Sequence, residues 1–434
     1  MNAGRVTNAI RLVGVVVFLE LLCGLLSGQV VRMSTPSATI PETYFGMHIH
    51  SMVRPRPGMS AADPWPIVPF GAWRLLAAYV DWPNLEPSKG QWQFSTLDNY
   101  VNLAEQRKVE ILMPLVLTPG WASSRPNEKS YYTTGNAAPP KDLEDWRAFV
   151  RAVAIRYKGR IHYYEIWNEP NLKGFFTGTP QELVTLTAEA RKILKEVDAA
   201  NLVVSPSATM AQGVAWLDQF LAAGGGKYVD VIGYHFYVAP DAPEAMVPLI
   251  KRVRDVMLKH RVASLPLWDT ESGWMIENHK GVVKPRDRTG LYSKVFTDDD
   301  ASTFVARSYV VLWAAGVSRF FWYAWDDGEM GLTENGGTVV KPPAKAYSSI
   351  ENWLVGARML MCDRYSGIWN CRLQRDGGYS GWVVWSTVGA KQFSFLPAWG
   401  VKRMRDLDGN VRNLSGAKTV GIGPKPILLE TGAP

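Results

Sequence analysis

The chain has 434 residues, of which 47% are apolar and 20% are charged, and its formal net charge at pH 7 is +7. This length exceeds what one hydrophobic core usually supports, so we expect a large domain and a smaller one, and the composition excludes a disordered chain or a polytopic membrane protein. The charge is modest and no basic tract, zinc pattern or nucleic-acid motif accompanies it, so no DNA or RNA partner is expected.

A targeting segment is predicted over residues 1–30. Arg5 and Arg11 flank the start of an apolar run, residues 12–26, that is interrupted only by Glu20. The run suits the core of a signal peptide and is short for a spanning helix, which needs about 20 residues. No clean cleavage site follows it, so two readings stay open. The chain is exported to the periplasm or secreted, or it stays anchored in the inner membrane through residues 12–26 and faces the periplasm.

Residues 31–356 alternate between strand-like and helix-like segments. Short apolar runs predict eight strands, at residues 44–50, 73–77, 110–117, 162–168, 202–207, 229–237, 265–271 and 319–325. Continuous apolar runs of this length are typical of parallel strands that are covered on both faces. Eight strand–helix units predict a (β/α)8 TIM barrel.

Local signals mark where the intervening helices begin and end. Residues 95–98 resemble a capping box, and residues 179–182 give an N-cap threonine, a proline at the first helical position and a glutamate at the third. The three aspartates at 298–300 suit a helix N-terminus, whereas Gly316 and Gly356 suit helix C-termini.

The pattern changes after Gly356. Alternation of period two at residues 367–375, 381–387 and 392–396, with turn residues between, predicts a small antiparallel β-sandwich over residues 357–434 that packs on the barrel. This domain contains Cys362 and Cys371. In an exported chain they could form a disulfide, or each could be a buried thiol.

Two acidic residues, Glu169 and Glu271, end the fourth and seventh predicted strands and precede turn residues. In a barrel, the carboxyl ends of the strands build the active site. Hydrolysis of a glycosidic bond needs two carboxyl groups, because one protonates the leaving oxygen while the other attacks or stabilises the anomeric carbon. Strand alternation places Glu165 and Asp269 on the same faces but deeper, where we expect structural carboxylates that need a buried partner.

The tripeptide Asn168-Glu169-Pro170 at a fourth strand and the pair Thr270-Glu271 at a seventh strand resemble the signatures of the clan A glycoside hydrolases. Within that clan the chain most resembles family 39, especially PslG-type endoglycosidases linked to bacterial exopolysaccharide, over both domains. The resemblance implies a retaining double displacement with Glu169 as acid/base and Glu271 as nucleophile. It also implies that Asn168 holds the 2-hydroxyl of the sugar.

Three further candidates lie on predicted strands. Arg74 resembles the clan's arginine that hydrogen-bonds the nucleophile, although a structural salt bridge would also explain it. His235 and Tyr237 end the sixth strand on one face, where they could bind a hydroxyl and orient Glu271, or could be satisfied core groups.

Aromatic and imidazole groups complete the candidate substrate site. Trp325, at the end of the eighth strand, resembles the aromatic floor of the clan's central subsite, and Trp121 could stack on a sugar or simply pack. His50 and His48 lack a third ligand at usable spacing, so we expect hydroxyl recognition or core packing rather than a metal site. No organic cofactor is expected.

We therefore expect an exported, monomeric, retaining β-glycosidase that is endo-acting on a bacterial exopolysaccharide. The alternatives are an exo-glycosidase or transglycosidase, and a non-catalytic polysaccharide-binding protein of an export machine. Intact carboxylates at both positions favour the enzyme.

Overall fold

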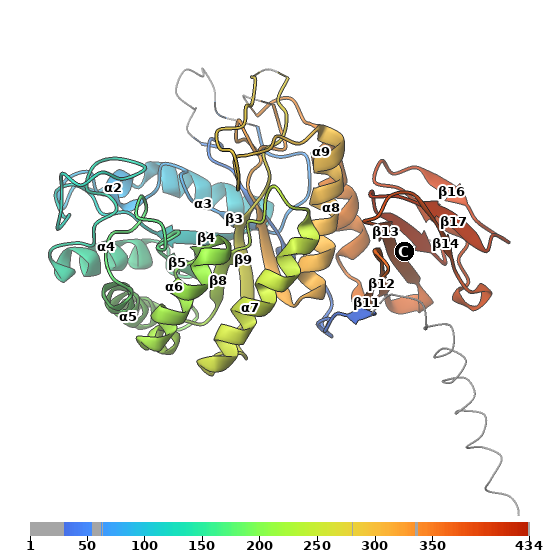
Figure 1. The fold of residues 1–434 in the computed structure, drawn as a ribbon. Helices are drawn as coiled ribbons and strands as arrows, with labels where there is room; N and C mark the ends of the chain where they lie inside the picture. The colour runs from blue at the N-terminus through green and yellow to red at the C-terminus, as the bar shows by residue number, and fades with distance from the viewer. Residues whose placement is uncertain (1–29, 54–61, 63, 280, 335–336, 433–434) are drawn as a thin grey trace, which may run out of the picture.

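The computed structural model describes residues 30–53, 62, 64–279, 281–334 and 337–432. It has two parts, a helix-wrapped parallel sheet and an antiparallel β domain that lies beside it (Figure 1). The predicted targeting run at residues 12–26 lies outside the described residues. Among the helices of the described part, none is long and apolar enough to span a membrane.

The parallel sheet contains a strand at every position that the apolar runs predicted, and the strand ends differ from the predicted ones by at most three residues. Its strands are β2 (Phe45–His48), β3 (Ala72–Arg74), β4 (Glu110–Leu115), β5 (Tyr163–Ile166), β6 (Leu202–Val204), β7 (Ala208–Thr209), β8 (Ile232–His235), β9 (Leu267–Ser272) and β10 (Val317–Trp322). They follow the order β6-β5-β4-β3-β2-β10-β9-β8-β7.

The two ends of this sheet come close to each other. β6 and β7 stand at opposite ends of the strand order, yet only three residues separate them in the chain. In addition, Val204 of β6 forms a parallel bridge with Val231, just before β8. Side chains from separate strands meet inside the sheet, namely Ala72, Leu112, Val204, Val231, Trp268 and Phe321. The sheet is therefore curled into a TIM-like barrel.

Helices surround the sheet (Figure 1). They are α2 (Trp82–Leu85), α3 (Ser95–Arg107), α4 (Leu143–Arg156), α5 (Pro180–Val197), α6 (Met210–Ala222), α7 (Met246–Lys259), α8 (Asp298–Ala314) and α9 (Pro342–Leu354). Short 3-10 turns lie at Glu42–Tyr44, Gly225–Tyr228 and Pro243–Ala245.

Most of the predicted helix ends are confirmed. Thr179 and Glu182 form the capping box of α5, the three aspartates occupy the first turn of α8, and Gly316 and Gly356 follow α8 and α9 with positive φ. The capping box predicted at residues 95–98 is wrong. α3 has Phe94 as its N-cap residue, so Ser95 already lies inside the helix, where its hydroxyl cannot play the N-cap role.

The C-terminal domain is antiparallel, as predicted. Its larger sheet has the order β1-β11-β12-β13-β18-β15-β16, and β14 pairs with β17. Apolar residues from both sheets share one core. The strands are β1 (Val31–Arg32), β11 (Arg358–Tyr365), β12 (Ile368–Gln374), β13 (Ser380–Ser386), β14 (Lys391–Ser394), β15 (Arg403–Arg405), β16 (Val411–Asn413), β17 (Thr419–Ile422) and β18 (Ile427–Glu430), with 3-10 turns at Asp376–Gly378 and Pro397–Trp399.

Strand β1 corrects the expected domain boundary, which assigned all of residues 31–356 to the barrel. Val31 and Arg32 pair antiparallel with β11, and Thr39 forms a further bridge to Arg358. The outer edge of β11 would otherwise present unpaired backbone groups, which the N-terminal segment satisfies. On the other side of β11, Cys362 lies opposite Cys371 of β12, and the two form a disulfide.

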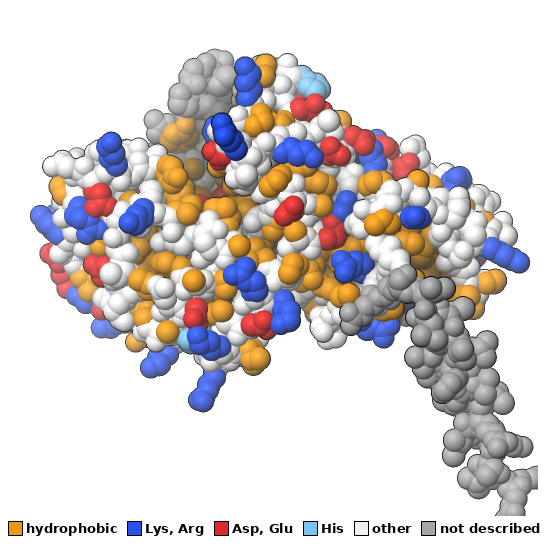
Figure 2. All heavy atoms as spheres, in the orientation of Figure 1, with side chains coloured by type: hydrophobic (Ala, Val, Ile, Leu, Met, Phe, Trp, Pro, Cys, Tyr) orange, Lys and Arg blue, Asp and Glu red, His pale blue; other side chains and the backbone are white. Residues whose placement is uncertain are grey.

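Polar contacts join the two parts. The indole N–H of Trp385 in β13 donates to Oε1 of Glu244 at 2.8 Å, and the same carboxylate pairs with Arg307 of α8. Figure 1 places α8 and α9 on the side of the barrel next to the β domain. On the face drawn in Figure 2, Lys and Arg side chains are scattered rather than gathered in one patch, which agrees with the modest net charge.

Candidate active site

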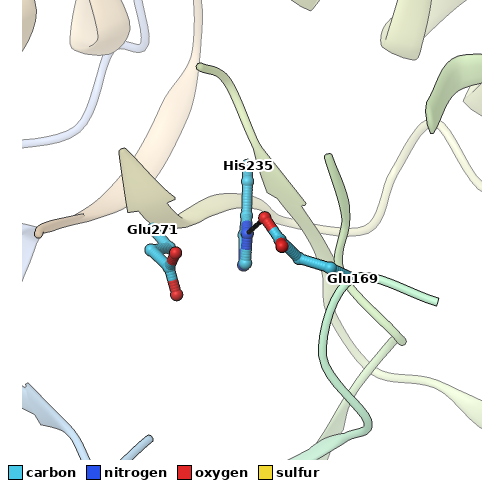
Figure 3. A group of neighbouring side chains, drawn as sticks. All are labelled: Glu169, His235 and Glu271. Carbon is cyan, nitrogen blue, oxygen red and sulfur yellow. Dashed lines mark hydrogen bonds and ion pairs between the residues drawn. The ribbon is translucent and has the colours of Figure 1, made fainter. Parts of the chain in front are cut away.

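The two predicted catalytic glutamates lie at the carboxyl ends of parallel strands and face each other. Glu169 follows β5 by three residues, and Glu271 lies near the end of β9. Each is only 8% exposed. Figure 3 shows the imidazole of His235, from the end of β8, between the two carboxyl groups. One carboxylate oxygen of each glutamate and one ring nitrogen of His235 all lie within 4.8 Å of one another.

Arg74, the last residue of β3, joins three of the polar groups at this end of the barrel. Its guanidinium donates to Glu165 Oε2 at 2.6 Å, to Glu271 Oε2 at 2.8 Å and to Asn168 Oδ1 at 2.8 Å. Arg74 is completely buried, so these charged contacts are little screened. The structure thus places Arg74, Asn168 and Glu271 together. Arg74 forms both the buried salt bridge with Glu165 and the contact with Glu271.

Glu271 is held at both of its oxygens. The hydroxyl of Tyr237 donates to Oε1 at 3.0 Å, opposite the contact of Arg74 with Oε2. Burial raises the pKa of Glu271 above its ordinary value, and the nearby charge of Glu169 adds to this rise. His235, Arg74 and Tyr237 oppose it by favouring the ionised form.

Glu169 has a different environment. Its Oε1 lies 3.0 Å from Nδ1 of His235, and burial raises its pKa to about 7. Burial also lowers the pKa of His235 to about 4, so the imidazole is neutral at pH 7. Two carboxyl groups within a few ångströms therefore differ in character. Glu169 is stabilised in its protonated form, whereas Glu271 is contacted directly by a cation.

Glu165 and Asp269 are the buried structural carboxylates that the sequence predicted. Glu165 is bound by Arg74 and accepts a hydrogen bond from the hydroxyl of Ser207 at 2.5 Å. Asp269 accepts from the hydroxyl of Ser272 at 2.9 Å and from backbone N–H groups. Both acids are completely buried.

The strand alternation used to predict these positions does not extend as far as the two glutamates. β5 ends at Ile166, and both Trp167 and Glu169 have positive φ, so their side chains no longer alternate. β9 and β10 are out of step near Glu271. Asp269 pairs with Phe320 and Ser272 pairs with Trp322, so β9 contains one more residue than β10 between these two pairs. The extra residue re-aims the side chains, as a β-bulge does.

His50 is fixed by a carboxylate. Its Nδ1 lies 2.9 Å from Asp326 Oδ1, and Asp326 also accepts from the backbone N–H groups of His50 and Ser51. Burial alone lowers the pKa of His50, but the charges of Asp326 and Glu271, among others, outweigh it and raise the pKa above its ordinary value. The charge of Glu271 thus acts on His50, whose role in hydroxyl binding stays a prediction.

Trp325 does not fit the predicted role of an aromatic floor. It is 1% exposed and belongs to the main hydrophobic core. Tyr323, the first residue after β10, lies beside the site instead. Its ring packs against His48 and His50, with centroids 5.1 and 5.2 Å apart, and the charge of Glu271 acts on its hydroxyl.

Trp121 is partly buried, and its indole N–H donates to the backbone oxygen of Glu86 at 3.0 Å. Its role in sugar stacking stays a prediction.

Sequence reasoning missed other residues near the two glutamates. An apolar cluster around Tyr237 includes Met275, Met330, Tyr292 and Tyr323. A single tyrosine in a loop carries no signal of this kind, because only the fold brings the loops together.

Within the part of the chain that the structure describes, two groups of side chains have the spacing of metal ligands. One is Glu169, His235 and Glu271, and the other is Glu277, His279 and Asp298 near the start of α8. In the first group, Glu169 already contacts His235, and Glu271 contacts Arg74 and Tyr237. These contacts give the carboxylates partners from the protein itself and suit acid–base chemistry.

Comparisons with known proteins agree with this geometry. Residues 77–278 match the family model described as "Glycosyl hydrolases family 39". A β-xylosidase of Geobacillus stearothermophilus is 29% identical over 202 residues, which is 40% of this chain and 39% of that protein. A β-xylosidase of Caldicellulosiruptor saccharolyticus is 29% identical over 154 residues, which is 34% of this chain and 31% of that protein. The chain thus spans well under half the length of the curated relatives that it matches.

Solved structures extend the likeness of the fold to almost the whole chain. A family 39 glycoside hydrolase from Bacteroides cellulosilyticus WH2 superposes with a TM-score of 0.68 at 17% identity, over 90% of this chain and 81% of that one. A monomeric β-xylosidase from Caulobacter crescentus CB15 gives 0.62 at 18% identity, over 92% and 97%. These identities show the fold alone. The central segment of the chain is thus similar to family 39 glycoside hydrolases in sequence, and the chain shares their fold over most of its length.

Proposed function

We propose that the protein is a retaining β-glycosidase in which Glu169 is the acid/base and Glu271 is the nucleophile. One observation carries the proposal. Two buried carboxyl groups lie with oxygens within 4.8 Å of each other, one with its pKa raised to about 7 and the other bound by Arg74 and Tyr237. Retaining glycosidases need carboxyl groups about 5–5.5 Å apart, whereas inverting ones need about 6.5–9.5 Å to admit a water molecule.

The proposed reaction has two steps. In the first, protonated Glu169 gives its proton to the glycosidic oxygen as that oxygen leaves the anomeric carbon, and a carboxylate oxygen of Glu271 forms a bond to the same carbon. In the second, ionised Glu169 takes a proton from water, and the oxygen of that water displaces Glu271. Both glutamates return to their starting states.

Neighbouring residues support these roles. Arg74 and Tyr237 leave Glu271 with an ionised, oriented carboxylate, and His235 holds the carboxyl group of Glu169. Asn168, fixed by Arg74, stands beside both and is our candidate for binding the 2-hydroxyl. His50 and Tyr323 are our candidates for contacts with the other sugar hydroxyls and the sugar ring.

For the substrate, we propose endo-action on a bacterial exopolysaccharide, supported by the resemblance to PslG-type endoglycosidases. An exo-acting β-xylosidase is the second candidate, because the matched relatives are named β-xylosidases. The two differ in their products. Endo-action shortens a polymer to mixed oligosaccharides from the first minutes, whereas exo-action releases monosaccharide.

The test uses wild-type protein, Glu169→Gln, Glu271→Gln and the matched control Glu144→Gln, a carboxylate on the surface of α4. Each is incubated with a panel of 4-nitrophenyl β-glycosides and purified exopolysaccharides. We expect the control to match wild type and both site variants to lose at least 1,000-fold in kcat/KM on substrates with poor leaving groups, on the order of 4 kcal/mol. Full activity in either site variant would contradict the mechanism. Labelling of a residue other than Glu271 by a 2-deoxy-2-fluoro glycoside would contradict the nucleophile.

Three further proposals concern the number of strands in the barrel, the oligomeric state and the location of the protein. We infer that β6 and β7 are parts of one interrupted strand, which would give the barrel eight strands, supported by the bridge from Val204 to Val231. We also propose that the enzyme is a monomer, which gel filtration with light scattering tests. Export rests on the apolar run at residues 12–26. Periplasmic protein that keeps residues 1–29 would favour an anchor, and protein that lacks them would favour cleavage.

A further inference from the structure

An aromatic cluster lies directly beside the turn that carries Glu169. It consists of Tyr131 and Tyr132, from the loop between β4 and α4, and Phe175, from the segment between β5 and α5. The ring of Tyr131 is 4.8 Å from that of Phe175, and the ring of Tyr132 is 5.8 Å from it. We call these three residues the aromatic cluster.

Backbone hydrogen bonds connect this cluster to Glu169. The N–H of Leu172 donates to the carbonyl of Glu169, and the N–H of Phe175 donates to the carbonyl of Leu172, each at 2.9 Å. The N–H of Tyr131 donates to the carbonyl of Gly174, also at 2.9 Å. The position of the cluster is therefore fixed relative to Glu169 through two short turns.

Gly174 makes room for Tyr131. A Cβ atom at position 174 would lie 2.2 Å from the ring of Tyr131, which no real contact permits. Its φ does not lie in the left-handed region, so the absence of a side chain serves the approach of the ring rather than the backbone conformation. The seat of Tyr131 on this segment is thus specific to glycine.

Both tyrosines present surface to solvent, but in different ways. The side chain of Tyr131 is 70% exposed, so one ring face is available. Tyr132 is 40% exposed, and burial of its hydroxyl, together with the charges of Asp81, Glu271 and Glu169, raises the pKa of Tyr132 well above its ordinary value. A neutral hydroxyl near both catalytic carboxylates can donate to or accept from a sugar.

The side of the site on which the cluster lies follows from chemistry. The general acid must stand next to the leaving oxygen, so groups fixed to the segment of Glu169 stand on the leaving-group side of the scissile bond. We propose that the aromatic cluster is the subsite for a sugar on the leaving-group side, with Tyr132 binding a hydroxyl and Tyr131 stacking on a ring. This inference rests on the proposed function and deepens it, because it requires a saccharide rather than a small alcohol as the leaving group.

The test compares two substrates with the same donor sugar. The two substrates are methyl β-D-xyloside and β-1,4-xylobiose. The leaving group of each is an alcohol that needs the proton of Glu169, but only the leaving group of xylobiose is a sugar ring. If wild-type protein prefers another donor sugar, the methyl glycoside and disaccharide of that sugar replace them. The readout is the ratio of the two kcat/KM values, so a displaced Glu169 lowers both values and leaves the ratio unchanged.

We expect Tyr132→Phe and Tyr131→Ala each to lower kcat/KM for the disaccharide, relative to kcat/KM for the methyl glycoside, about fivefold to tenfold. This is the effect of one hydrogen bond or one stacked ring. Gly174→Ala, which displaces the ring of Tyr131 without removing it, should lower the ratio in the same direction. Tyr365→Ala is the matched control, an exposed tyrosine in β11 of the β domain.

An unchanged ratio in all three cluster variants would overturn the subsite, as would an equal loss on both substrates. A wild-type protein that cleaves no glycoside, disaccharide or exopolysaccharide of the panels would overturn the proposed function and this inference with it. Circular dichroism and thermal midpoints verify that the variants are folded.

Discussion

Replacing Tyr237 by Phe tests how the site keeps Glu271 ionised. The hydroxyl of Tyr237 donates to Oε1 of Glu271 at 3.0 Å, while Arg74 independently holds Oε2 at 2.8 Å. A phenylalanine ring would keep the packing of Tyr237 against Met275 and Met330. The substitution therefore removes one buried hydrogen bond and little else.

The magnitude follows from the charge of the acceptor. A hydrogen bond to a charged group contributes about 1.5–3 kcal/mol, and 1.36 kcal/mol corresponds to one pH unit in a titration. Because the hydroxyl of Tyr237 favours the ionised carboxylate, its loss raises the pKa of Glu271 further. The nucleophile must be ionised, so the acidic limb of the kcat/KM profile should move to higher pH by about one to two units.

The assay is the pH dependence of kcat/KM for a 4-nitrophenyl glycoside that wild-type protein cleaves. Deprotonation of Glu169, with its pKa at about 7, sets the alkaline limb, which should move much less. The bell-shaped pH profile of kcat/KM should therefore become narrower on its acidic side. Tyr379→Phe is the matched control, since its hydroxyl donates to Glu430 at the same distance of 3.0 Å in the β domain. An acidic limb that stays in place in Tyr237→Phe would refute the reasoning.

Three further predictions concern stability. The raised pKa of Glu169 means that folding favours its protonated form, a contribution that is fully present below about pH 4.5 and lost as the pH rises through about 7. In urea unfolding, the free energy of unfolding of Glu169→Gln should therefore exceed that of wild type by on the order of 3 kcal/mol at pH 8 and should equal it at pH 4. An equal increase at both pH values would contradict this. Arg74→Lys should lower the free energy of unfolding by about 3–5 kcal/mol at pH 7, because a compact ammonium lacks the wide guanidinium fork whose three nitrogens each reach a different acceptor; a loss below 1 kcal/mol would contradict it. Glu244→Ala should lower the thermal midpoint at unchanged kcat, because Trp385 and Arg307 lose their shared acceptor, at a cost of about 1–3 kcal/mol; an unchanged midpoint would show that this contact is not needed.

The strands could be predicted from the sequence because a buried parallel strand requires a continuous apolar run, which is a local property. The same holds for the capping box of Thr179 and Glu182, whose two partners are three residues apart. The capping box at residues 95–98 failed although its pattern was similar. A pattern of residue types does not determine where a helix begins. Phe94, before Ser95, already has φ and ψ in the αR region, and no side chain caps the helix.

The positions of the two candidate glutamates at strand ends could be predicted, but not the way in which their side chains are aimed. Alternation holds only within regular strands, and both glutamates lie where the strand is irregular, one after a positive φ and the other at an extra residue in β9. The same limit explains the shift from Trp325 to Tyr323. A difference of two positions along an irregular strand end decides which aromatic ring lies beside His48 and His50, and no local signal marks that difference.

Loop residues of the site were not predictable in this way. Tyr131, Tyr132 and Phe175 belong to two connections that are far apart in sequence, and each resembles any surface aromatic until the barrel brings them together. Gly174 carried the only local signal, a small residue next to aromatic ones, and that signal has many other causes.

The pairing of β1 with β11 makes the barrel an insertion between two neighbouring strands of one sheet. Arg32 and Asp363 are more than 300 residues apart in the chain, so this edge of the sheet can close only after the intervening residues have collapsed. Completion of the β domain should therefore report on completion of the barrel. A fragment that begins at residue 357 would expose the edge of β11 and should associate with other chains, however well its own core is packed.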